Sequence, residues 1–431
     1  MAAALQTPNT YRSLHRLGVV CGLAAGAWLG AAEAPVKFVT LGLSPVLISF
    51  VFVAGVFVAR WTLPALLAGT GQVMLDLRSR PHLIVWAVLA GALWAVANTL
   101  TVFAIRDVGL AIAFPIWNIN SLVGVFWGWL FFRELRAASR REWMQVVVAA
   151  VAIAGGAVIL AGAARTASAA GVAAHAGAGI AAALGAGLLW GTMYVPYRKA
   201  YLSGMNPLSF VTIFTLGEGV TMTALALGFL GGASGLAAAL ARARPALFWL
   251  FLGGFCWVVG DLFQQYAAKY IGIGRGIPLS NTNQLWGLAW GALVFGELRG
   301  LSGAARAWVI AGSATMIMGA LLMAGASASE AEQACWRQAV ERECRRYGLR
   351  REEALRAQRG EFAAAEPAAP RRRAGDGLIV LAALGCFAGL ALIARRQPLA
   401  VHTGWMAALL AAMLALLLAG GSLLWRRTRF H

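Results

Sequence analysis

The chain has 431 residues, of which 60% are hydrophobic and only 12% are charged. A soluble protein of this length needs about three domains with polar surfaces, and too few charges are present to cover them. The formal net charge of +19 lies mostly in short loops and in one basic stretch near the C-terminus. This distribution is typical of the cytoplasmic loops of membrane proteins and argues against a nucleic-acid partner.

Apolar stretches long enough to cross a bilayer recur along the chain and predict an all-α integral membrane protein. Ten predicted spans precede Ser327. They are 15–32, 45–66, 82–104, 108–132, 142–163, 177–195, 207–231, 245–268, 272–296 and 304–326. Residues 327–375 form a linker rich in Arg and Glu, and two further spans, 376–394 and 401–424, make a C-terminal hairpin within 376–431.

The two halves of the ten-span region resemble each other. Aligned without gaps at an offset of 163, Pro115–Arg136 and Pro278–Arg299 share 12 of 22 positions. The same offset pairs Trp94 with Trp257 and Asn98 with Asp261. Each copy, 15–163 and 177–326, holds five spans. Because five is odd, the second copy enters the membrane from the opposite side to the first. The sequence therefore predicts two inverted five-helix repeats, an architecture common in secondary transporters.

The basic residues of the loops indicate the orientation. With residues 1–14 inside, the loops with Arg78 and Arg80, and with Arg140 and Arg141, are cytoplasmic. The bias is modest but favours a cytoplasmic N-terminus, and it places the basic linker 327–375 on the same side. We expect a multi-pass protein of the inner (cell) membrane.

Polar side chains at membrane depth follow one face of the eighth span: Trp257, Asp261, Gln264 and Gln265. Trp94, Asn98 and Thr101 repeat this stripe in the third span. A carboxylate, two amides and an indole on one helix face match the hydroxyls and the apolar face of a sugar. The alternative is that these residues bond neighbouring helices together.

Two prolines precede the polar residues of the fourth and ninth spans. Pro115 and Pro278 are predicted helix breaks, because proline lacks an amide hydrogen and disturbs the preceding turn. Freed backbone groups are tolerated in a bilayer only inside protein or beside a cavity. The polar residues that follow are predicted to line two walls of one central cavity; they are Asn118, Asn120, Asn281, Asn283 and Gln284.

Asp261 and Glu218 are the candidates for a proton-coupling carboxyl, since both lie inside apolar spans. A paired structural role for Glu218 is equally consistent with the sequence, which offers it no cationic neighbour. Glu134 and Glu297 are interpreted as end caps or surface ion pairs beside Arg136 and Arg299. No metal site, cofactor or catalytic motif is expected.

The segments GALWAVANTLTVFAIRDVGLAIAFPIWNINSLVGVFWGWLFFREL and GGFCWVVGDLFQQYAAKYIGIGRGIPLSNTNQLWGLAWGALVFGEL carry a family resemblance. They resemble the glucose/ribose porter family of the drug/metabolite transporter superfamily, and also its rhamnose and ureide permeases. The resemblance covers about residues 15–326 and implies ten helices in two inverted halves, with proton-driven sugar uptake across the inner membrane. The corresponding residues are Trp94, Asn98, Pro115, Trp257, Asp261, Pro278 and Asn281.

The sequence thus predicts a secondary transporter for a sugar or similar polyol, with membrane lipid and the proton as further partners. Two alternatives remain: an exporter of amphipathic metabolites or drugs, and a transporter-derived sensor or scaffold that signals through 328–375. The linker is expected to form a helix along the inner membrane face, and the hairpin to pack outside the ten-helix core. Neither is expected to line the substrate path.

Overall fold

The computed structural model describes residues 8–36, 38–39, 42–108, 113, 116–167, 176–296, 302–326, 330–359, 372–395 and 400–430. This part of the chain is mostly helical and contains no strand. Ten of its helices are long and apolar enough to cross a membrane. The chain is therefore an all-helical, multi-pass membrane protein.

Eight of the ten long helices correspond to predicted spans of the core. They are α1 (Pro8–Ala31), α3 (Pro45–Leu67), α5 (Leu83–Val108), α8 (Arg140–Ala167), α9 (Ala176–Leu202), α10 (Pro207–Leu230), α12 (Leu247–Ile271) and α15 (Gly303–Gly325). Short helices join several of them: α2 (Glu33–Val36), α4 (Thr70–Ser79), α11 (Gly232–Arg242) and the 3-10 turn η1 (Arg244–Ala246).

The predicted fourth and ninth spans are not continuous helices. The ninth consists of α13 (Ile273–Ser280), a turn at Asn281 and Thr282, α14 (Asn283–Ala289) and a π-helical turn, η2 (Trp290–Val294). Pro278 lies inside α13, so the break falls three residues after the proline rather than at it. In the fourth span, α7 (Asn120–Phe132) begins only after a turn at Asn118 and Ile119. Pro115, the other predicted break, lies outside the described residues.

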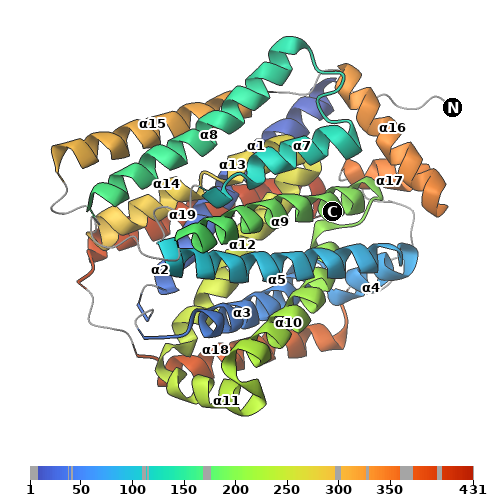
Figure 1. The fold of residues 1–431 in the computed structure, drawn as a ribbon. Coiled ribbons are helices and arrows are strands. Elements are labelled where there is room, and N and C mark those ends of the chain that lie inside the picture. The colour runs from blue at the N-terminus through green and yellow to red at the C-terminus, as the bar shows by residue number, and fades with distance from the viewer. Residues whose placement is uncertain are drawn as a thin grey trace.

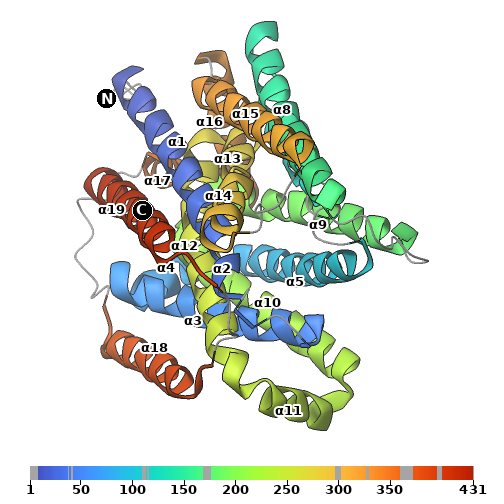
Figure 2. The ribbon, with the colours of Figure 1, turned by 90° about the vertical axis from the view of Figure 1, so that its left-hand side faces the viewer.

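Four helices form the centre of the bundle: α3, α5, α10 and α12 (Figures 1 and 2). Helix α1 packs along α12, and α9 packs along α5. The broken segments follow the same pattern, since α13 and α14 contact α1 while α7 contacts α9. Helices α8 and α15 pack against each other at one side of the bundle, as Figure 2 shows.

The C-terminal region adds four helices, α16 (Glu330–Tyr347), α17 (Arg351–Gln358), α18 (Ala374–Ile393) and α19 (Thr403–Thr428). Helices α18 and α19 lie at the outside of the core, as predicted, with α18 against α3 and α12 and α19 against α1. Helices α16 and α17 cover one end of the bundle, at the right of Figure 1. We call this end the α16 face.

Candidate functional site

A fully buried charged cluster lies among α3, α10 and α12. One guanidinium nitrogen of Arg60 lies 2.8 Å from Glu218 Oε2, and the other lies 2.7 Å from Asp261 Oδ2. The three side chains are 0% exposed. Charges at this depth are retained only when they are paired, and they commonly mark transport or proton pathways.

Aromatic rings and a backbone contact hold Arg60 in place. Its guanidinium carbon lies 4.2 Å from the centre of the Phe214 ring and 5.5 Å from that of Trp257. The hydroxyl of Thr212 donates to the Arg60 carbonyl at 2.9 Å. Cation–π contacts of this kind strengthen when water is excluded, so the guanidinium is fixed between two rings and two carboxylates.

The cluster is unbalanced in charge. One guanidinium against two carboxylates leaves a net charge of −1 when both acids are ionised. Glu218 Oε1 is buried without a hydrogen-bond partner among the described residues. A single proton would neutralise the cluster, and that free oxygen is a place where it can bind.

A hydrogen-bonded chain leads from the cluster toward the α16 face. Asp261 Oδ1 accepts from the Gln265 amide at 2.7 Å, and the Gln265 carbonyl oxygen accepts from the Tyr201 hydroxyl at 2.6 Å. The nearby Tyr197 hydroxyl is buried with no partner among the described residues. Trp94 of α5 meets Trp257 edge to face, with ring centres 5.2 Å apart.

A second polar group surrounds the break in the ninth span. Gln264 donates to the Ser280 hydroxyl at 2.6 Å. Asn281 donates to the side-chain oxygen of Asn120 at 3.0 Å and also to the hydroxyl of Ser121. The two broken segments are therefore joined through their asparagines, which satisfies polar groups at membrane depth.

The predicted site residues divide between these two groups. Asp261 belongs to the charged cluster; Trp257 and Gln265 contact it, and Trp94 packs on Trp257. Gln264, Asn120 and Asn281 lie at the break. The predicted stripe on α12 thus reaches two different sets of partners. Asn118 is buried in the turn before α7, and Asn283 Oδ1 and Gln284 Nε2 are buried without partners among the described residues. In α5, Asn98 is half-buried, and its carbonyl accepts from the Thr101 hydroxyl at 2.7 Å.

Arg60 and Tyr201 were missing from the prediction. Arg60 is the cationic partner of Glu218 that was not found near it in sequence, because the two residues are 158 positions apart. A signal was present nonetheless, since Arg60 is the single charged residue of the stretch PVLISFVFVAGVFVARWTLPALL. An isolated arginine inside a span predicts a buried counter-ion, although not which one.

The interpretation of Glu134 as a surface residue paired with Arg136 is wrong. Glu134 is buried, and its Oε1 lies 2.9 Å from Arg198 Nε. It also accepts the amide hydrogens of Ile273 and Gly274, at 3.4 and 3.0 Å, and so caps α13 rather than its own helix. Gly272 makes the turn from α12 to α13 at φ 84°, and a Cβ there would lie 2.8 Å from the Glu134 carboxylate. Glu297 lies outside the described residues.

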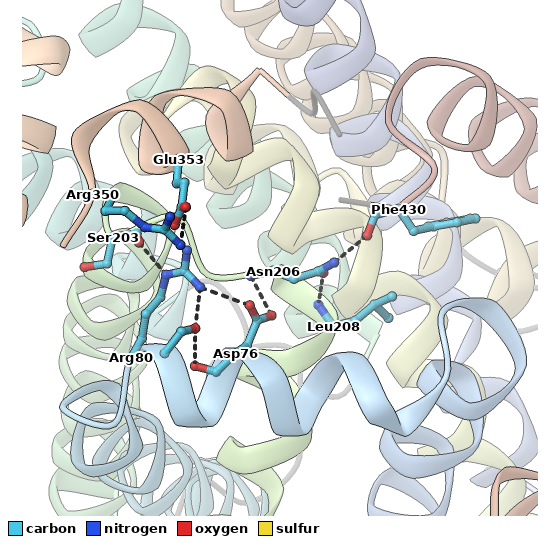
Figure 3. A network of polar contacts seen from close by, with 9 residues as sticks. Asp76, Arg80, Ser203, Asn206, Leu208, Arg350, Glu353 and Phe430 are labelled. Atoms are coloured by element: carbon cyan, nitrogen blue, oxygen red, sulfur yellow. Dashed lines mark hydrogen bonds and ion pairs between the residues drawn. The ribbon is translucent and has the colours of Figure 1, made fainter. Parts of the chain in front are cut away.

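Further polar contacts close the α16 face (Figure 3). Arg80 donates to the Ser203 carbonyl at 2.7 Å and lies 3.1 Å from Asp76. Asn206 donates to the Phe430 carbonyl at 2.7 Å and accepts from the Leu208 amide at 2.9 Å. The Asn206 amide also donates to Asp76 at 3.3 Å. These contacts join α4 to the turn between α9 and α10, and that turn to the end of the C-terminal hairpin.

Comparison with known proteins assigns no family. No protein-family model matches the chain, and no curated protein matches it. A solved crystal structure of a protein is similar over 71% of this chain and 95% of that chain, with 16% identity and a TM-score of 0.45. A likeness this weak supports no argument about function, which therefore depends on the site itself.

Proposed function

We propose that the protein is a secondary active transporter that moves a sugar or similar polyol across the inner membrane by alternating access, coupled to protons. The observation that carries the proposal is the buried Arg60–Glu218–Asp261 cluster, whose single excess negative charge is suited to binding one proton. Glu218 and Asp261 are the proton-coupling residues, and Arg60 is their shared counter-ion.

The substrate would bind beside this cluster. Trp94 and Trp257 offer aromatic faces, and Gln265 offers a donor and an acceptor. Asn283 and Gln284, at the break in the ninth span, have polar atoms without partners among the described residues and would extend the site. Sugar hydroxyls need such paired donors and acceptors. In the conformation described here, Asp261 and Gln265 are closed off from solvent, so substrate enters only after helices separate.

We further propose that the core consists of two inverted repeats, as alternating access often requires. Close contacts of glycines support this, because a contact between the two halves recurs when each residue is replaced by its counterpart in the other half. A Cβ at Gly55 would lie 2.1 Å from the Phe251 carbonyl oxygen, and a Cβ at Gly217 would lie 2.1 Å from that of Val88. Gly217 is 162 positions after Gly55, and Phe251 is 163 positions after Val88, so each contact is the counterpart of the other.

Two more contacts follow the same rule. Helix α8 approaches α15 at Gly156 beside Met316, and again at Gly319 beside Ile153. Gly319 is 163 positions after Gly156, and Met316 is 163 positions after Ile153. The second contact is therefore the first with the two helices exchanged. Such exchanged contacts are what a twofold axis between the two halves produces, and an odd number of spans in each half would place that axis in the membrane plane.

The test is proton-driven uptake in proteoliposomes, after thermal-shift screening of the purified protein against a panel of sugars and polyols. Asp261→Asn leaves a balanced Arg60–Glu218 pair, so we expect the protein to fold and to exchange labelled for unlabelled substrate. Concentrative uptake driven by a pH gradient should fall to the level of empty liposomes.

Glu352→Gln is the matched control, because Glu352 is an exposed acid far from the cluster. Full accumulation by Asp261→Asn would remove Asp261 from the coupling mechanism. Stabilisation by amphipathic amines rather than by any polyol would favour the alternative of an exporter. No stabilisation by either class would favour the sensor or scaffold.

A further inference from the structure

Helix α16 is bound to the core through a buried carboxylate. Glu332 makes a bidentate ion pair with Arg275 of α13, and each nitrogen–oxygen distance is 2.8 Å. Both side chains are buried. The same carboxylate accepts the Leu135 amide hydrogen at 3.1 Å. One side chain thus joins α16 to α13 and to the turn after α7. The prediction that this segment lies only along the membrane surface is therefore wrong for Glu332.

A second set of contacts joins α16 to α9. Lys199 lies 2.7 Å from Glu343 and 4.8 Å from the centre of the Tyr347 ring. The Arg198 guanidinium lies 4.9 Å from the centre of the Trp336 ring. Two consecutive basic residues of α9 are thus held by three side chains of α16.

The two helices that α16 joins both pack against α12, the helix that carries Asp261. Helix α9 supplies Tyr201, which bonds to Gln265 and through it to Asp261. Helix α13 ends at Ser280, which bonds to Gln264. Arg198 also donates to the carbonyls of Ala268 and Lys269 at the end of α12. Movement of α9 away from α12 and α13 would therefore open a path from Asp261 to the α16 face.

We propose that α16 is the gate of this path and that the Arg275–Glu332 pair is its lock. As long as Glu332 holds α13 and Glu343 holds α9, the two helices cannot separate, so α16 must leave one of them in each transport cycle. The inference rests on the proposed transport function and gives the linker a part in it. It replaces the expectation that the linker lies beside the path without affecting it.

The test measures opening directly and needs no substrate. In a chain whose five native cysteines are replaced by alanine, Ser280→Cys supplies a buried reporter of nearly unchanged shape. A membrane-impermeant maleimide is added to vesicles of both orientations. The α16 face is identified by an N-terminal tag, because α1 begins at this end, where His15 bonds to the Ala324 carbonyl of α15.

Glu332→Gln should raise the labelling rate from the α16 face at least about tenfold, because loss of one partner of a buried ion pair strongly disfavours the closed arrangement. Labelling from the opposite face should not rise. Glu341→Gln is the matched control: it makes the same change on the same helix, in a pair whose arginine is exposed and whose carboxylate is partly exposed, so the rate should change less than about twofold.

Glu343→Gln is the second variant in case Glu332→Gln does not fold. Its pair with Lys199 is mostly buried but less so than Arg275–Glu332, so labelling should rise by a smaller factor, about threefold. Unchanged labelling in a folded variant would show that α16 is a static clamp and would overturn the gate. Opening by Glu332→Gln without transport of any polyol would keep the gate and reject the sugar proposal.

Discussion

Two groups of buried ion pairs in this protein differ in their balance of charge. In the central cluster, one guanidinium pairs with two carboxylates, and no backbone amide within the described ranges donates to them. Near the α16 face, Glu134 and Glu332 each have one guanidinium partner and also accept backbone amide hydrogens. A balanced pair with backbone support resists change, whereas an unbalanced one responds to a proton. We therefore assign proton coupling to the central cluster, and the holding together of helices to the pairs of Glu134 and Glu332.

The largest expected effect comes from Arg60→Ala. It leaves Glu218 and Asp261 buried without a counter-ion, and breaking a buried pair costs about 3–5 kcal/mol. We expect little protein in the monodisperse peak of size-exclusion chromatography and a lower Tm in detergent. The triple variant Arg60→Met, Glu218→Gln, Asp261→Asn should recover the fold but not the uptake. A stable Arg60→Ala protein with the Tm of the native chain would contradict the central role of the guanidinium.

A smaller effect is expected from Glu134→Gln. Arg198 keeps its bonds to the carbonyls at the end of α12, so the loss is about 1.5–3 kcal/mol, typical of a hydrogen bond to a charged group. The Tm should fall, while the number of protons moved per substrate, measured as a reversal potential, should stay the same. A changed ratio would place Glu134 in the coupling mechanism and remove the distinction between the two groups.

The smallest expected effect concerns pH and His82, whose ring stacks on Tyr347 of α16 with ring centres 3.8 Å apart. Burial, together with the nearby Lys199, lowers the pKa of His82 from its ordinary value of 6.5. A group with a lowered pKa in the folded protein stabilises it above 6.5, and that contribution is lost as pH falls through the lowered value. Amide exchange in α16, corrected for its intrinsic pH dependence, should therefore rise in acid, and His82→Gln should flatten that rise. The same rise in both proteins would exclude His82.

Ten of the twelve predicted spans are long apolar helices, because such a helix needs only a run of apolar residues. The fourth and ninth spans are not continuous helices, and the sequence predicted a break only from their prolines. The polar face of α12 was also predictable, because Asp261, Gln264 and Gln265 lie within five positions of one another in the sequence. The sequence did not predict that Gln264 and Gln265 reach different partners, because the partners come from α13 and α9. Likewise, Arg60 finds its counter-ions only in the folded bundle, and Glu332 is one acid among several in a charged linker until Arg275 is brought against it.

The position of Arg60 also bears on how the protein is made. Its two partners follow 158 and 201 residues later in the chain. At about 5–20 residues per second, synthesis reaches Glu218 about 8–30 s after Arg60, and Asp261 about 10–40 s after it. Until then α3 carries an uncompensated charge, which costs about 2.5–3.5 kcal/mol near the centre of a membrane helix. The apolar residues of α3 must therefore outweigh this cost on their own until α10 and α12 arrive.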